Sequence, residues 1–277
     1  MLAPPLERIA VAIPYKNIAF VLESLDYAIN ENVNFIEIRF DYNEKLKELT
    51  NLKESYENLN ELEKNKLMEY IKVQVFPSED IIKILEMRKR NNKLKFIFTL
   101  RKYDERGKFH IEESLRLEII KYLLEFNPDY LDLESQIEKD ILLNFNNLAK
   151  IMGVSLIFSY HNWINTPSKT EIKRIINDLI QKCPDLEPIE GKNNRNVLKL
   201  IFTAKKLSDN DVVLSICKEY SSKGLNVIIF CMGKEGIFSR IGCLNFGSYF
   251  SFASIYEETA PGQIHIKDFK NILLDKI

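Results

Sequence analysis

Short apolar runs alternate with stretches of helical periodicity along most of this chain. Such alternation is typical of parallel strands joined by helices, and eight strand-like runs in 277 residues predict a closed (β/α)8 barrel, an α/β fold formed by a single domain over residues 1–277. The predicted strands are residues 9–13, 33–38, 95–100, 130–133, 154–159, 197–202, 226–230 and 246–251. The predicted helices include residues 17–31, 112–126, 137–152, 170–181 and 209–222.

Two segments exceed what a minimal barrel needs. Residues 44–72 are dense in Lys, Glu, Asn and Leu, which indicates an amphipathic helical insertion with a solvated face. Residues 183–194 form a polar loop before the sixth predicted strand. Neither segment contains a chemical motif, so we expect both to be surface elaborations.

Polar side chains collect where five consecutive predicted strands end. For any one of them, a structural salt bridge or a surface charge is the simpler explanation. Barrel enzymes, however, carry their chemistry at the carboxyl ends of the strands, and all five strands follow this pattern in the same direction. The residues concerned are Glu37, Arg39, Asp41, Arg101, Glu105, Asp132, Glu134, His161 and Lys199.

Lys199 lies inside the apolar sixth run, Val-Leu-Lys-Leu-Ile-Phe. Burial disfavours an ammonium group, and cationic neighbours would act in the same direction, so the pKa of this amine could approach the working pH. A neutral amine is a nucleophile that condenses with ketones. The alternative is a strand at a sheet edge, where the lysine extends its charged end into water.

The chain has three histidines, and His161 is the one that closes an apolar strand, where a general base would be presented. A hydrogen-bonded structural histidine is the alternative, and we expect His110 and His265 to face solvent. After the seventh strand, Arg240 is a candidate for gripping a carboxylate with two hydrogen bonds. Gln263 follows the Pro261-Gly262 turn after the eighth strand, where barrel enzymes often bind anions.

Composition argues against several classes of partner. The chain is 45% hydrophobic and 29% charged with a net charge of −1, so no global charge favours nucleic acid or an anionic membrane. The four cysteines do not resemble a zinc site or a disulfide framework, and we expect a reducing compartment. The sequence shows neither a signal-peptide pattern nor a membrane-spanning run, so a cytoplasmic protein is expected.

Several ordered motifs resemble one known family over about residues 9–274, which is nearly the whole chain. These motifs are Phe-Ile-Glu-Ile-Arg-Phe-Asp from residue 35, Phe-Thr-Leu-Arg from 98 with Glu105, and Leu-Asp-Leu-Glu from 131. The others are Ser-Tyr-His from 159, Val-Leu-Lys from 197, Met-Gly-Lys-Glu-Gly from 232 with Ser239 and Arg240, Phe-Gly-Ser from 246, and Ala-Pro-Gly-Gln from 260. Each motif is weak alone, but the ordered set resembles type I 3-dehydroquinate dehydratase.

The resemblance implies a (β/α)8 barrel, usually a homodimer, that dehydrates 3-dehydroquinate to 3-dehydroshikimate in the shikimate pathway without metal or cofactor. It implies that Lys199 forms a Schiff base with the substrate ketone, that His161 transfers protons and that Glu105 orients His161. For substrate binding, it implies ring-hydroxyl contacts from Glu37, Arg39 and Arg101, carboxylate contacts from Arg240, Gln263, Thr259 and Ala260, and ring walls formed by Met232 and Phe252.

The sequence departs from the family pattern at a few positions. Arg106 stands where the family usually has the first of two glycines, Phe230 where methionine is common and Thr259 where serine is common. Two other functions stay open. One is a class I aldolase or another imine-forming lyase, and the other is a catalytically silent paralogue that binds quinate-like acids. The Ser-Tyr-His and Ala-Pro-Gly-Gln motifs argue against an aldolase, and the presence of Lys199, His161 and Glu105 argues against a silent relative.

Overall fold

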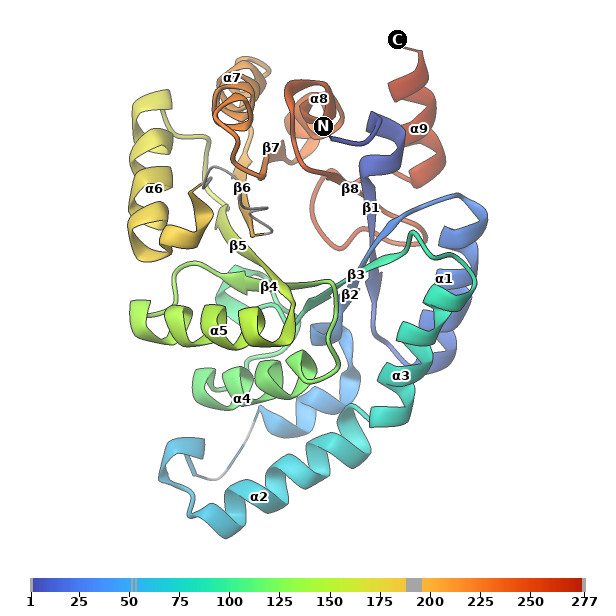
Figure 1. Ribbon diagram of the computed structural model, residues 1–277, viewed down its shortest axis with the longest axis vertical. Coiled ribbons are helices and arrows are strands. Elements are labelled where there is room, and N and C mark those ends of the chain that lie inside the picture. The colour runs from blue at the N-terminus through green and yellow to red at the C-terminus, as the bar shows by residue number, and fades with distance from the viewer. Residues whose placement is uncertain (1, 51, 53, 188–195, 276–277) are drawn as a thin grey trace.

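The computed structural model describes residues 2–50, 52, 54–187 and 196–275 of the chain. In this part of the chain, parallel strands form one sheet in the order β7-β6-β5-β4-β3-β2-β1-β8, surrounded by helices (Figure 1). The backbone N–H of Tyr249 donates to the carbonyl of Val227 (2.7 Å), which links the approach to β8 with the start of β7 and nearly closes the ring. The strands are β1 (Ile9–Pro14), β2 (Phe35–Arg39), β3 (Lys95–Thr99), β4 (Tyr130–Glu134), β5 (Ser155–Asn162), β6 (Val197–Thr203), β7 (Val227–Met232) and β8 (Ser251–Ala253). The predicted (β/α)8 barrel is confirmed.

Helices connect successive strands and cover the outside of the barrel. The predicted first helix is present, and its N-cap Asn17 accepts a hydrogen bond from the backbone N–H of Phe20 (2.9 Å), which satisfies one of the free donors at the helix start. The helices are α1 (Ile18–Asn30), α2 (Glu61–Tyr70), α3 (Ser78–Glu86), α4 (Glu113–Leu124), α5 (Lys139–Met152), α6 (Lys169–Lys182), α7 (Ser208–Ser222), α8 (Ile237–Gly242) and α9 (Ile266–Leu274).

The eighth strand differs from its prediction. Phe246 ends a 3₁₀ helix (Cys243–Phe246), and Gly247 then turns the chain with φ 91°, so that the strand begins only at Ser251. The apolar residues before Ser251 fill the base of the barrel instead of pairing in the sheet. The ring of Phe250 stacks on that of Phe35 at 4.8 Å, and the hydroxyl of Tyr249 bonds with that of Tyr130 (2.9 Å).

Side-chain alternation along the strands separates the two faces of the barrel wall. In β2, Ile36 and Ile38 are fully buried, and Glu37 and Arg39 point to the other side. In β6, Lys199 pairs in register with Ser159 of β5. Because parallel neighbours in register direct their side chains to the same face, these polar groups meet inside the barrel near the carboxyl ends of the strands.

The 44–72 segment consists of short helical pieces. A 3₁₀ helix (Glu44–Leu49) buries Leu46 and Leu49, whereas α2 buries none of its residues and extends from the lower end of the molecule (Figure 1). Tyr56, in the middle of the segment, is also buried, and Leu67 and Met68 of α2 pack partly buried against the core. Of the predicted polar loop 183–194, residues 184–186 form a 3₁₀ helix and residues 188–194 lie outside the described part.

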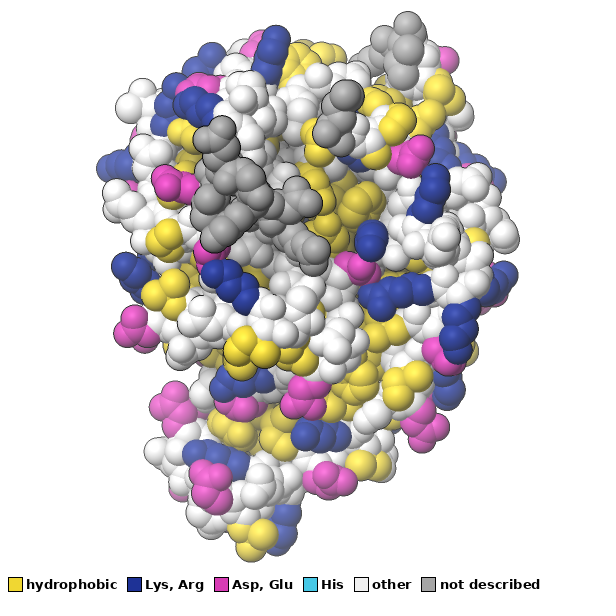
Figure 2. All heavy atoms as spheres, in the orientation of Figure 1, with side chains coloured by type: hydrophobic (Ala, Val, Ile, Leu, Met, Phe, Trp, Pro, Cys, Tyr) yellow, Lys and Arg dark blue, Asp and Glu magenta, His cyan; other side chains and the backbone are white. Residues whose placement is uncertain are grey.

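Surface charges of both signs are mixed, and the cysteines form no disulfide. Figure 2 shows basic and acidic side chains interspersed over the face in view, as expected from a net charge of −1. All four cysteines are buried and unpaired. Within the described ranges, every helix is too short or too polar to cross a bilayer.

Candidate active site

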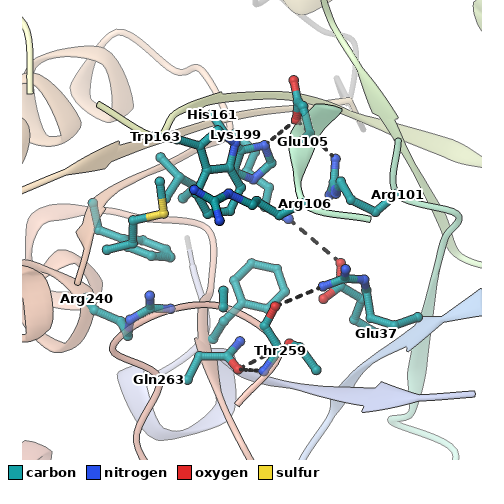
Figure 3. Close-up of a pocket in the computed structure, with 16 residues that line it drawn as sticks. Glu37, Arg101, Glu105, Arg106, His161, Trp163, Lys199, Arg240, Thr259 and Gln263 are labelled. Carbon is teal, nitrogen blue, oxygen red and sulfur yellow. Dashed lines mark hydrogen bonds and ion pairs between the residues drawn. The ribbon is translucent and has the colours of Figure 1, made fainter. Parts of the chain in front are cut away.

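A cavity that is partly open to solvent lies at the carboxyl ends of the strands (Figure 3). All twelve residues that the sequence analysis selected as site residues line it. They are Glu37, Arg39, Arg101, Glu105, His161, Lys199, Met232, Arg240, Phe252, Thr259, Ala260 and Gln263. Four further residues complete the wall: Arg106, Trp163, Ile201 and Phe230. Residues from all parts of the chain therefore converge on one small chamber.

Lys199 projects from β6 into this cavity and is 5% exposed. Its Nζ donates to Oδ2 of Asp132 (2.7 Å) and lies 3.8 Å from Oε1 of Glu37. It also lies 4.4 Å from the ring centroid of Phe252, where the aromatic face favours a cation. Cationic neighbours, which would favour a neutral amine, do not pair with Nζ; its charged partners among the described residues are carboxylates, which stabilise an ammonium. The edge-strand alternative is excluded, because β6 lies between β5 and β7.

Arg101 joins Lys199 to a buried network of charges beneath the cavity. Its guanidinium lies 3.0 Å from both Asp132 and Glu134, and it donates to the hydroxyl of Ser159 (2.9 Å). Burial by itself would raise the pKa of Asp132, but Arg101 and Lys199 outweigh it and hold this pKa below its usual range. Asp132 therefore remains an anion that fixes the position of Lys199 Nζ.

His161 and Glu105 form a close pair at the cavity wall. Nδ1 of His161 lies 2.6 Å from Oε2 of Glu105, which leaves Nε2 as the imidazole nitrogen available to a bound molecule. Burial lowers the pKa of His161 well below its usual value, and the cations Arg101 and Lys199 lower it further. Burial also raises the pKa of Glu105 to about 8, although Arg101 opposes this shift. The pair can thus exchange one proton near neutral pH.

Arg240 and the loop after β8 form another part of the wall. Arg240 is 1% exposed, donates to the carbonyl of Pro261 (2.9 Å) and has no carboxylate partner among the described residues. Its Nε is buried without a hydrogen-bond acceptor, and burial lowers its pKa to about 10. The carboxamide oxygen of Gln263 accepts hydrogen bonds from the backbone N–H (2.7 Å) and the hydroxyl (3.1 Å) of Thr259, which orders this loop. A buried guanidinium that lacks an anion is a natural site for a ligand carboxylate.

The family model for type I 3-dehydroquinase matches residues 9–275. The chain belongs to the type I 3-dehydroquinase family. Among its relatives, 3-dehydroquinate dehydratase of Alkaliphilus oremlandii is 34% identical over 180 residues, a match that spans 64% of this chain and 66% of that relative. The enzyme of the same name from Thermococcus onnurineus is 31% identical over 179 residues, which span 64% of this chain and 74% of that relative.

Solved structures with the same fold include two 3-dehydroquinate dehydratases. The protein from Geobacillus kaustophilus has a TM-score of 0.74 and 18% identity, with 97% of this chain and 90% of that chain covered. The type I protein from Clostridium difficile has a TM-score of 0.73 and 21% identity, with 98% of this chain and 92% of that chain covered. Almost the whole chain therefore shares the fold of these two structures.

Two residues of the cavity wall, Trp163 and Ile201, were not among the site residues predicted from the sequence. Ile201 follows Lys199 by two residues on β6, and Trp163 follows His161 by two residues just past the end of β5, so the alternation of side chains could have identified them. The indole of Trp163 stacks on the imidazole of His161, with centroids 5.7 Å apart and planes at 22°. The sequence indicates Asp132 as a carboxylate at a strand end but does not indicate that it pairs with Lys199. That ion pair joins β4 to β6, which are not adjacent in the sheet.

Proposed function

We propose that the chain dehydrates 3-dehydroquinate to 3-dehydroshikimate through an imine on Lys199. The observation that carries this proposal is the cavity itself: a buried lysine and an imidazole–carboxylate pair share it with Arg240, a buried cation that lacks a carboxylate partner among the described residues. The membership of the type I 3-dehydroquinase family and the names of its relatives support the choice of substrate. In this proposal residues 1–277 form a single catalytic domain, with 44–72 as an insertion.

The first step joins the amine of Lys199 to the substrate ketone. The ion pair with Asp132 favours the ammonium, so Nζ must first release a proton, and neutral His161 is the acceptor that we assign to this step. Nζ then attacks the carbonyl carbon, and the imidazolium returns its proton to the oxygen, which leaves as water. A protonated imine and a neutral imidazole remain. This cation withdraws electrons from the neighbouring carbon and makes its proton acidic.

The second step is the elimination. Nε2 of His161 removes the proton from C2, the electron pair moves into the imine, and the C1 hydroxyl then leaves as water after it takes the proton from the imidazolium. One imidazole thus serves as base and then as acid, and each of these roles typically contributes roughly 10² to 10⁴-fold. Hydrolysis of the product imine consumes one water and restores Lys199. Glu105 keeps Nδ1 engaged throughout, so that Nε2 faces the substrate.

The remaining wall positions the substrate. We assign the carboxylate to Arg240, Gln263 and the segment Thr259–Ala260, and the ring hydroxyls to Glu37, Arg39 and Arg101. Arg39 is itself held by a two-point ion pair with Asp41 (2.8 and 2.9 Å), so its guanidinium is fixed before substrate binds. Met232 and Phe252 would enclose the ring.

The direct test is the absorbance of the conjugated enone product after addition of 3-dehydroquinate. A second sample is treated with borohydride during turnover, and mass spectrometry locates the reduced adduct. We expect enone formation and one adduct on Lys199. Binding without enone would favour the silent paralogue, and an adduct that releases a cleaved carbon fragment would favour an aldolase. Sedimentation velocity of the same sample tests the homodimer that the family resemblance implies.

A further inference from the structure

Arg106 lies at the boundary between the catalytic cavity and a larger outer hollow. It lines the cavity, and it also lines a second, more open hollow together with Trp163, Thr203, Met232, Gly233 and residues 258–261. Arg106, Trp163, Met232, Thr259 and Ala260 are common to both. These five residues lie where the two hollows meet, and Figure 3 shows Arg106 beside Trp163 at the cavity wall.

The guanidinium of Arg106 has no anionic partner among the described residues. Five cationic side chains line the cavity, and three of them, Arg39, Arg101 and Lys199, are ion-paired to carboxylates. The other two are Arg240, which is buried, and Arg106, which is exposed at the entrance. Glu258 lines the outer hollow but forms no ion pair with Arg106. Its carboxylate accepts a hydrogen bond from the backbone N–H of Gly262 (3.2 Å).

The backbone at Arg106 adopts a conformation that does not suit arginine. Its φ is 65° and its ψ 28°, the left-handed region that glycine adopts without strain, and the family pattern usually has glycine here. Its Cζ lies 5.4 Å from the ring centroid of Trp163, which in turn stacks on His161. The side chain is therefore directed over the entrance at some cost in backbone energy, and such strained residues cluster at functional sites.

We propose that Arg106 is a substrate-positioning residue of this chain, which holds a hydroxylated carboxylate in the cavity from the solvent side. The inference rests on the proposed function for the identity of the substrate. Arg240 contacts the anion from within the protein. Arg106 attracts it at the entrance and then donates hydrogen bonds to its outward-facing oxygens, with the indole of Trp163 fixing the plane of the guanidinium.

Trp163 is the only tryptophan of the chain, so its fluorescence reports on this entrance alone. The probe is quinate, a hydroxylated cyclohexane carboxylate, titrated by fluorescence and again by calorimetry at several salt concentrations. The variants are Arg106→Gln, Arg106→Lys and Arg106→Gly. Lys108→Gln is the matched control, since Lys108 is an exposed cation two residues away that lines neither hollow.

Arg106→Gln should weaken quinate binding about tenfold and reduce its salt dependence, because one charge-assisted contact is lost. Arg106→Lys should keep the salt dependence and recover part of the affinity, and Lys108→Gln should match the parent. Arg106→Gly should bind as weakly as Arg106→Gln without a loss of Tm, since glycine removes the backbone strain. In turnover, Arg106→Gln should raise KM about tenfold and leave kcat nearly unchanged.

Arg106→Gln that binds quinate within twofold of the parent would overturn the proposal. A second result would also overturn it: a lowered Tm for Arg106→Gly, with a loss of quinate affinity no larger than the loss of stability explains. Arg106 would then be a residue that stabilises the fold. Binding of quinate involves no chemistry, so a parent protein that binds it but forms no enone refutes the proposed dehydration and leaves the role of Arg106 standing. A parent that binds no quinate in either assay refutes the role of Arg106.

Discussion

For the proposed dehydration, we predict a pH dependence that follows from the pair formed by His161 and Glu105. When both groups share one additional proton, Nε2 of His161 is protonated whether that proton is assigned to the carboxyl or to the imidazole. If Glu105 is the acid, its O–H donates to Nδ1 and the imidazole hydrogen lies on Nε2. If the imidazole is the acid, both nitrogens carry hydrogen. Nε2 can act as a base only after the pair has lost this proton.

The pH at which kcat/KM changes follows from the burial of Glu105. Burial raises the pKa of Glu105 to about 8, so the active, deprotonated pair predominates above that pH and is lost as the pH falls. One pH unit below the pKa, about a tenth of the free enzyme is active, so kcat/KM should rise roughly tenfold per unit below pH 8 and then level off.

Glu105→Gln is the informative perturbation. A carboxamide cannot titrate, so the rise of kcat/KM towards pH 8 should disappear. It also holds Nδ1 less firmly than a carboxylate does, and kcat should fall by roughly 10² to 10⁴-fold. Asp104→Asn is the control, because Asp104 is the adjacent carboxylate of the same 3₁₀ helix and is exposed to solvent. The assay is the initial rate of enone formation between pH 5.5 and 9.5. A flat profile in the parent, or the same rise in Glu105→Gln, would refute the reasoning.

Four further changes test other parts of the site. Lys199→Ala should abolish turnover and the borohydride adduct; an adduct that persists would place the imine on another residue. His161→Ala should still form the adduct but no enone, and normal turnover would remove His161 from the mechanism. Arg240→Met should weaken substrate binding by about 1.5 to 3 kcal/mol and raise Tm, because it removes a buried cation that no carboxylate of the described residues pairs with; an unchanged KM would place the carboxylate elsewhere. Gly107→Ala should lower stability by about 1 to 3 kcal/mol, since its Cβ would lie 2.1 Å from the carbonyl oxygen of Arg101; an unchanged Tm would contradict this.

The sequence alone was sufficient to predict the barrel, and the twelve residues that it nominated line one cavity. Period-two alternation at the ends of strands depends only on local geometry, and in β2 it places Glu37 and Arg39 on one face, opposite Ile36 and Ile38. Parallel strands then bring their carboxyl ends to one rim. The same local reasoning was wrong for residues 246–251, because an apolar run does not reveal whether it pairs in a sheet or fills the base of a barrel.

Only the tertiary structure decided which charges meet. The ion pair of Lys199 with Asp132 spans the barrel interior between β6 and β4, and the contact between Arg106 and Trp163 joins two loops that lie far apart in the sequence. Burial raises the pKa of Glu105 and keeps Arg240 apart from any carboxylate of the described residues, and it likewise arises from many packed elements together. Composition and spacing specify which groups are available, but electrostatic energies depend on distance and on exclusion of water, and these exist only once the chain has folded.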